Sequence, residues 1–61
     1  MDRKWKDLDE AQREAVEMLL ERQGLTRAYG LRWINSIDRA TGELWNGIDR
    51  MANTIRNCNH A

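Results

Sequence analysis

Apolar residues recur along the second half of the chain at alternating steps of three and four residues. The positions in this seam are Ile34, Ile37, Thr41, Leu44, Ile48, Met51, Ile55 and Cys58. This spacing is the a/d pattern of a helix that packs along one side against other helices. We therefore expect an all-α protein, with an oligomer seam formed by Ile34, Ile37, Leu44, Ile48, Met51 and Ile55.

Two glycines, Gly42 and Gly47, fall inside this pattern, and each follows a residue that is common in turns. A glycine costs a helix interior about 1 kcal/mol relative to alanine. The seam nevertheless passes both glycines without a change of phase, whereas a break in a helix normally resets it. We therefore predict one long helix over about residues 27–57, bent near Gly42, with a frayed tail at 58–61.

A shorter amphipathic helix is predicted before it, over about residues 7–23. Its apolar stripe consists of Leu8, Ala11, Ala15, Val16, Met18, Leu19 and Leu20. Asp7 or Asp9 is placed to cap its start, and Gly24 to end it in the left-handed conformation that suits glycine. Thr26 then caps the second helix, so the turn at about 24–26 is short. A short turn favours an antiparallel helical hairpin, although a helix-turn-helix corner also fits this segment.

The positions that flank the seam are mostly apolar or small, where a two-stranded coiled coil usually carries charges. The e positions are Leu31, Asp38, Trp45 and Ala52, and the g positions are Trp33, Ala40, Gly47 and Thr54. The apolar face of the long helix is therefore wider than the first helix alone can cover. We predict that two hairpins associate into a dimeric four-helix bundle, or into a higher oligomer.

Length and composition fit this expectation. A chain of 61 residues forms at most one domain, 1–61, with a marginal core of its own. Cys58 is the only cysteine, which excludes a disulfide within the chain and, without a leader segment, favours a cytoplasmic location. The longest apolar run is Met18-Leu19-Leu20, so we expect no membrane partner.

No catalytic, metal or cofactor motif stands out. His60 is the only histidine, and with Cys58 it supplies two soft ligands where a zinc site usually needs four. The glutamates of the first helix are read as a solvated face, and no glycine-rich phosphate loop is present. We therefore expect no enzyme, no metal and no cofactor.

Large aromatic residues are frequent for this length, with three tryptophans and one tyrosine. Tryptophan, tyrosine and arginine dominate binding hot spots. The interface candidates are Tyr29, Arg32, Trp33, Trp45 and Asp49. The sequence thus favours a small non-enzymatic protein that self-associates and binds or inhibits another macromolecule, with a protein as the expected partner. Small chains without catalytic residues are typical of accessory and inhibitor proteins of phages and mobile elements.

Two alternatives remain open. A nucleic-acid-binding regulator would use Arg27, Arg32 and Arg39 of the second helix to contact phosphates. Against it, no third helix is predicted to complete a trihelical core, and Gly30 occupies a position where a recognition helix usually buries a branched residue. The other alternative is an oligomer that holds a small nucleotide-like ligand between its subunits, against Trp, Tyr and Arg side chains.

Overall fold

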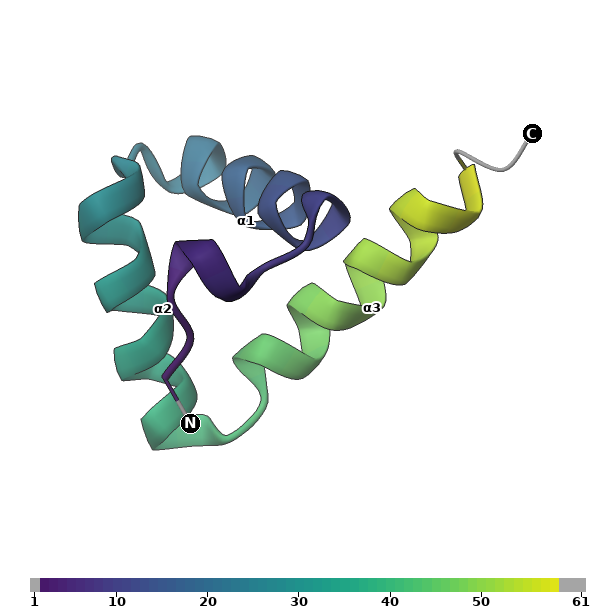
Figure 1. Cartoon of the computed structure of the whole chain (residues 1–61). Coiled ribbons are helices and arrows are strands. Elements are labelled where there is room, and N and C mark those ends of the chain that lie inside the picture. Colours follow the sequence, from purple (N-terminus) through teal and green to yellow (C-terminus); the bar gives the residue numbers. More distant parts are fainter. Residues whose placement is uncertain (1, 59–61) are drawn as a thin grey trace.

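The computed structural model describes residues 2–58, and these residues form an all-helical fold. Its elements are the 3-10 turn η1 (Trp5–Asp7) and the helices α1 (Glu10–Gln23), α2 (Arg27–Thr41) and α3 (Leu44–Cys58), as Figure 1 shows. The all-α prediction is confirmed. Of the predicted tail, Cys58 belongs to α3, and the rest lies outside the described residues. Within 2–58, no helix has both the length and the apolar character needed to cross a membrane.

The prediction of one long helix over 27–57 is wrong, because the chain breaks between α2 and α3. Gly42 adopts a φ of 73°, and its N–H donates to the carbonyl oxygen of Asp38 at 2.6 Å. The Asp38 carboxylate then accepts the backbone N–H of Trp45 at 3.0 Å and so satisfies a free donor in the first turn of α3. The seam keeps its phase because both helices turn their apolar stripes toward one shared core.

The other boundaries follow local signals. Asp9 caps α1 in a capping box with Gln12, so α1 begins three residues later than the predicted start at about 7. Gly24 ends α1 with a φ of 67°, as predicted. Thr26 accepts the N–H of Tyr29 at 3.4 Å at the start of α2. The short turn at 24–26 therefore joins two independently capped helices.

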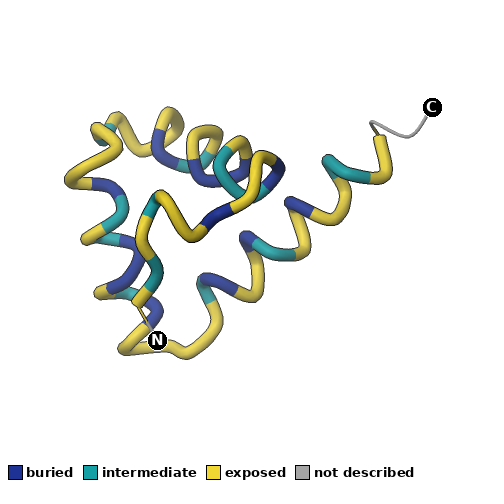
Figure 2. The backbone as a smooth tube through the Cα atoms, in the orientation of Figure 1, coloured by how far each residue is buried: buried dark blue, intermediate teal, exposed yellow. Residues whose placement is uncertain are grey.

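The core lies where the three helices meet (Figure 2). Its buried apolar residues are Leu8, Ala11, Ala15, Val16, Leu20, Ile34, Trp45, Ile48 and Ala52. α1 packs most extensively against α3 and much less against α2, its neighbour in sequence. The predicted hairpin of two helices is therefore not formed. The chain turns a corner at Gly24 into α2, and α3 then packs against α1 (Figure 1).

Gly30 sets how closely α2 passes α1. It is buried, and a Cβ added there would lie 2.3 Å from Cδ2 of Leu20. The branched side chain at this crossing is thus supplied by α1 instead of α2. Gly30 counted against a helix-turn-helix corner in the sequence. In the structure its missing side chain leaves the room that Leu20 occupies.

Candidate functional site

The outward face of α2 presents the most exposed large hydrophobic side chain among the described residues. Tyr29 is 71% exposed, and Arg32, one turn further on, is exposed as well. Trp33 beside them is half-buried and packs against the core. We call Tyr29, Arg32 and Trp33 the α2 surface. The structure brings these three interface candidates together, because the Thr26 cap and the Gly30 crossing fix the rotation of the helix.

Trp45 does not join this surface. It is 3% exposed, and its indole Nε1–H donates to Oδ1 of Asn35 at 2.8 Å inside the core. Its selection as an interface residue is therefore wrong. Burial against α1 and α2 accounts for this tryptophan.

Asp49 is also separate from the α2 surface. It is half-buried on α3, where both of its carboxylate oxygens accept from the guanidinium of Arg3, at 2.8 and 3.1 Å. Gln12 donates to the same carboxylate at 3.1 Å. The Arg3 guanidinium in turn lies 4.8 Å from the centre of the Trp45 ring, a cation–π contact. These contacts join the residues before α1 to α3.

Asn35 is a buried residue that the sequence pattern missed. Its Oδ1 accepts the backbone N–H of Arg3 at 3.0 Å, and its Nδ2 donates to the carbonyl oxygen of Arg3 at 3.0 Å. With the indole of Trp45, Asn35 thus connects three segments of the chain. No local signal marks it, because Arg3 lies 32 residues away in the sequence.

Three aspartates near these contacts have a pKa below the ordinary value of 3.8. The side-chain hydrogen bond from Arg39 lowers the pKa of Asp2, and that from Arg3 lowers the pKa of Asp49. The pKa of Asp9 falls mainly through the backbone N–H of Gln12 and then through Arg56. Each carboxylate is thus stabilised in its charged form by the fold.

The arginines of the nucleic-acid alternative all lie on α2 but are engaged differently. Arg27 lies 4.3 Å from the centre of the Trp5 ring, and Arg39 pairs with Asp2 at 2.6 Å. Arg32 has no ion pair within residues 2–58. The only acid on α2 is Asp38, which is buried, so the exposed charges of this helix are all positive.

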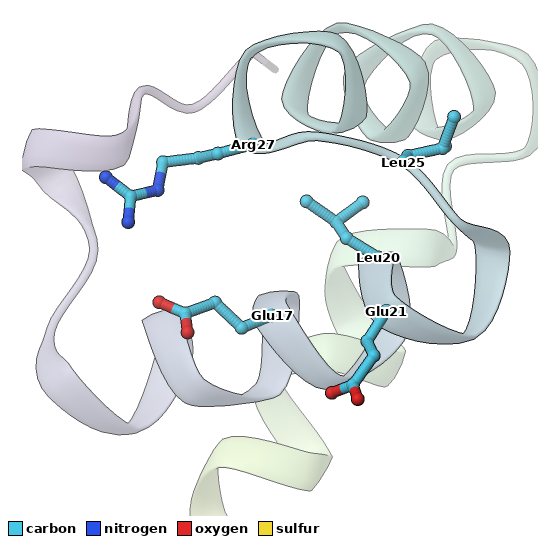
Figure 3. Close-up of a pocket in the computed structure, with 5 residues that line it drawn as sticks. All are labelled: Glu17, Leu20, Glu21, Leu25 and Arg27. Carbon is cyan, nitrogen blue, oxygen red and sulfur yellow. The ribbon is translucent and has the colours of Figure 1, made fainter.

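A shallow hollow of about 300 Å³ lies at the corner between α1 and α2. Its lining residues are Glu17, Leu20, Glu21, Leu25 and Arg27 (Figure 3). Glu17 and Arg27 extend to the same side of the hollow, whereas Glu21 points away from it (Figure 3). The carboxylate of Glu17 and the guanidinium of Arg27 therefore lie beside the apolar side chains of Leu20 and Leu25. Acidic residues of α1 thus border the positive side chains of α2 at this corner.

The predicted oligomer seam divides between the core and the surface. Ile34 and Ile48 are buried in the core, and Ile37, Leu44 and Ile55 are half-buried. Met51 is 41% exposed. An apolar hollow of about 150 Å³ between α1 and α3 is lined by Ala15, Leu19, Leu44, Gly47, Ile48 and Met51. We call it the α1–α3 groove.

Within the described residues, no group of three or more His, Cys, Asp and Glu side chains is arranged to hold a metal ion. Cys58 is exposed and forms no disulfide within the described residues, and His60 lies outside them. Comparison of the chain with protein-family models, with curated proteins and with solved structures finds no significant match. The arguments for function therefore rest on the residues and surfaces described above.

Proposed function

We propose that this chain is a small non-enzymatic binding protein that contacts an acidic region of another protein through the α2 surface. The observation that carries the proposal is the 71% exposure of Tyr29 beside the exposed Arg32. An exposed tyrosine offers a partner a large apolar ring together with a hydroxyl group that can form a hydrogen bond. Tyrosine and arginine together are the residue types that contribute most binding energy at protein interfaces.

The charge on α2 supports an acidic partner. Arg32 has no ion pair within residues 2–58, and the only acid of α2, Asp38, is buried, while the chain as a whole has no net charge. A local positive face on a neutral protein favours a charge-complementary protein surface. Half-buried Trp33, beside Tyr29 and Arg32, packs against the core, so a partner would meet a rigid surface.

The test places a photocrosslinking residue, p-benzoylphenylalanine, at position 29 and irradiates cells of the source organism that express the chain. We expect a discrete crosslinked adduct that disappears when Arg32→Ala is added. The control carries the same residue at the exposed position of Glu14 on α1 and should not give this adduct. Identical adducts from both positions, or an adduct that Arg32→Ala leaves unchanged, would refute the α2 surface.

Nucleic-acid binding is the second candidate, and one observation favours it. The sequence predicted no third helix, which counted against nucleic-acid binding. The structure has a third helix, α3, so the capped corner between α1 and α2 packs on a three-helix core. Helix-turn-helix proteins present the second helix of such a corner to the major groove. Here that helix is α2, with its three arginines.

A mixed-sequence DNA duplex and a stem–loop RNA, each titrated with the protein by fluorescence anisotropy, separate the two candidates. Binding to phosphates predicts an affinity that falls steeply with salt, and Arg32→Ala should reduce the log–log slope by about 1. Absence of binding to both probes at low salt excludes the nucleic-acid candidate and leaves the protein partner.

The remaining sequence-based predictions stay predictions. Self-association has no single long helix to act through, but α3 carries residues suited to it. A nucleotide-like ligand held between subunits would have Tyr29, Arg32 and Trp33 available, whereas Trp45 is occupied in the core.

A further inference from the structure

Gly47 is a glycine that the fold of one chain does not require. It lies inside α3 and donates its N–H to the carbonyl oxygen of Glu43 at 3.1 Å. Its φ is not positive, and nothing lies within 4 Å of the place where its Cβ would stand. Gly30, by contrast, makes room for Leu20. Because glycine weakens a helix interior, an exposed glycine without an internal reason indicates that a backbone approaches from outside.

The surface on either side of Gly47 differs in character. On one side is the α1–α3 groove, whose apolar lining includes Leu44 and the partly exposed Met51. On the other side is a polar hollow of about 300 Å³ lined by Glu43, Asn46, Gly47 and Arg50. A helix laid along Gly47 would therefore bury apolar side chains along one edge and contact charged side chains along the other.

Glu43 and Arg50 make this surface complementary to itself. Glu43 immediately precedes α3 and Arg50 lies inside it, and both line the same polar hollow beside Gly47. Neither has an ion pair within residues 2–58. In an antiparallel pair of α3 helices related by a two-fold axis beside Gly47, Glu43 of each chain faces Arg50 of the partner subunit. Symmetry forms both pairs at once, whereas a parallel pair would set like charges against each other.

We propose that α3 binds a second copy of this chain in this antiparallel, two-fold arrangement. Gly47 then faces Gly47 of the partner subunit across the axis, and Leu44 of the partner subunit lies near Met51 at the edge of the α1–α3 groove. The same contact repeats on the other side of the axis. The expected occupant is a second copy of the chain. Glu43 and Arg50 lie at nearly equal distances along the sequence on either side of Gly47, so a two-fold axis there brings each residue opposite its counterpart of opposite charge. The dimer interface consists of α1 and α3 from each chain, and the α2 surface of each chain stays exposed.

Charge reversal tests the arrangement, since Glu43 and Arg50 are exposed and neither has an ion pair within residues 2–58. Sedimentation equilibrium from micromolar to millimolar protein should show a monomer–dimer equilibrium. Glu43→Arg or Arg50→Glu alone places like charges opposite each other and should weaken the dimer by about tenfold or more. The double variant exchanges the two charges and should restore the original dissociation constant.

Gly47→Ala supplies a second, independent readout. Because the Cβ meets nothing within one chain, the variant should raise the melting temperature of the monomer at low concentration. The same methyl group stands between the two backbones, so dimerisation should weaken. A strictly monomeric protein at every concentration would overturn the proposal and leave the α1–α3 groove to a different protein. A dimer whose dissociation constant is unchanged by Glu43→Arg, Arg50→Glu and Gly47→Ala would overturn it as well.

Discussion

Gly30 and Leu20 lie in contact where α1 passes α2. The absence of a side chain at Gly30 makes room for the branched side chain of Leu20. Leu20 is 3% exposed, so its methyl groups have little room to move away from an added Cβ. A glycine in a helix usually signals weakness or flexibility. Here it permits the closest contact between the two helices and so fixes the direction in which α2 presents Tyr29.

Gly30→Ala is expected to lower the free energy of unfolding by about 1–2 kcal/mol, because overpacking outweighs the gain in helix propensity. The added Cβ would lie 2.3 Å from Leu20. Urea denaturation monitored by circular dichroism measures the change. Gly47→Ala is the matched control, since its Cβ meets no atom, and it should stabilise the monomer by up to about 1 kcal/mol. Equal effects of the two substitutions would show that packing at the crossing is unimportant.

The break between α2 and α3 depends on one side-chain hydrogen bond across the turn as well as on Gly42. The Asp38 carboxylate belongs to α2 but accepts a backbone N–H in the first turn of α3. It serves as a cap supplied from another helix and holds the two helices at the angle that closes the core. Both the donor and the carboxylate are buried, so water cannot replace this bond.

Asp38→Ala should therefore cost about 1–3 kcal/mol of folding stability, because it leaves the buried N–H of Trp45 without its partner. Amide hydrogen exchange at Trp45 should accelerate at the same time. Ser36→Ala, an exposed change on the same helix, should alter stability by no more than about 0.5 kcal/mol. Unchanged exchange at Trp45 in Asp38→Ala would contradict the capping role.

Signals that act within a few residues were readable from the sequence. Gly24 and Thr26 were assigned correctly as the cap residues around the first turn. The end of α2 was missed because a two-residue connection preserves the heptad phase, and the contact that favours the break is made by Asp38 through the fold. Trp45 was misplaced because a core and an interface select the same residue type.

At the scale of the whole molecule, three ion pairs within residues 2–58 join the segment before α1 to the later helices. Asp2 pairs with Arg39 of α2, and Arg3 pairs with Asp49 of α3. Asp9 pairs with Arg56, near the end of α3. The segment thus closes the side of the core between α2 and α3, where Figure 1 shows it running. Each pair is at least partly exposed, so the three are most effective as a set.

Acid should release this segment. The pKa of Asp2, Asp9 and Asp49 is lower in the folded chain than the ordinary 3.8, so their stabilisation is complete above that value. It is lost as the pH falls through the lower, folded-state pKa values. The urea midpoint is therefore expected to be level near neutrality and to decrease below about pH 4.

Asp49→Asn should reduce the midpoint at neutral pH and flatten its decrease in acid, because one of the three carboxylates no longer titrates. Glu14→Gln, which removes an exposed carboxylate without an ion pair among residues 2–58, should follow the original chain. A steeper acid dependence in Asp49→Asn than in the original would contradict this assignment.

The preference of α1 for α3 over α2 has a consequence for synthesis on the ribosome. The segment before α1 and α1 itself leave the exit tunnel before α2 and α3, yet α1 packs most extensively against α3, the last of the three helices to emerge. Until α3 emerges, Leu8 and Val16 have little to bury against, and Arg3 has no carboxylate to pair with. The nascent chain therefore gains little from partial folding, and its core forms in one step once α3 is free.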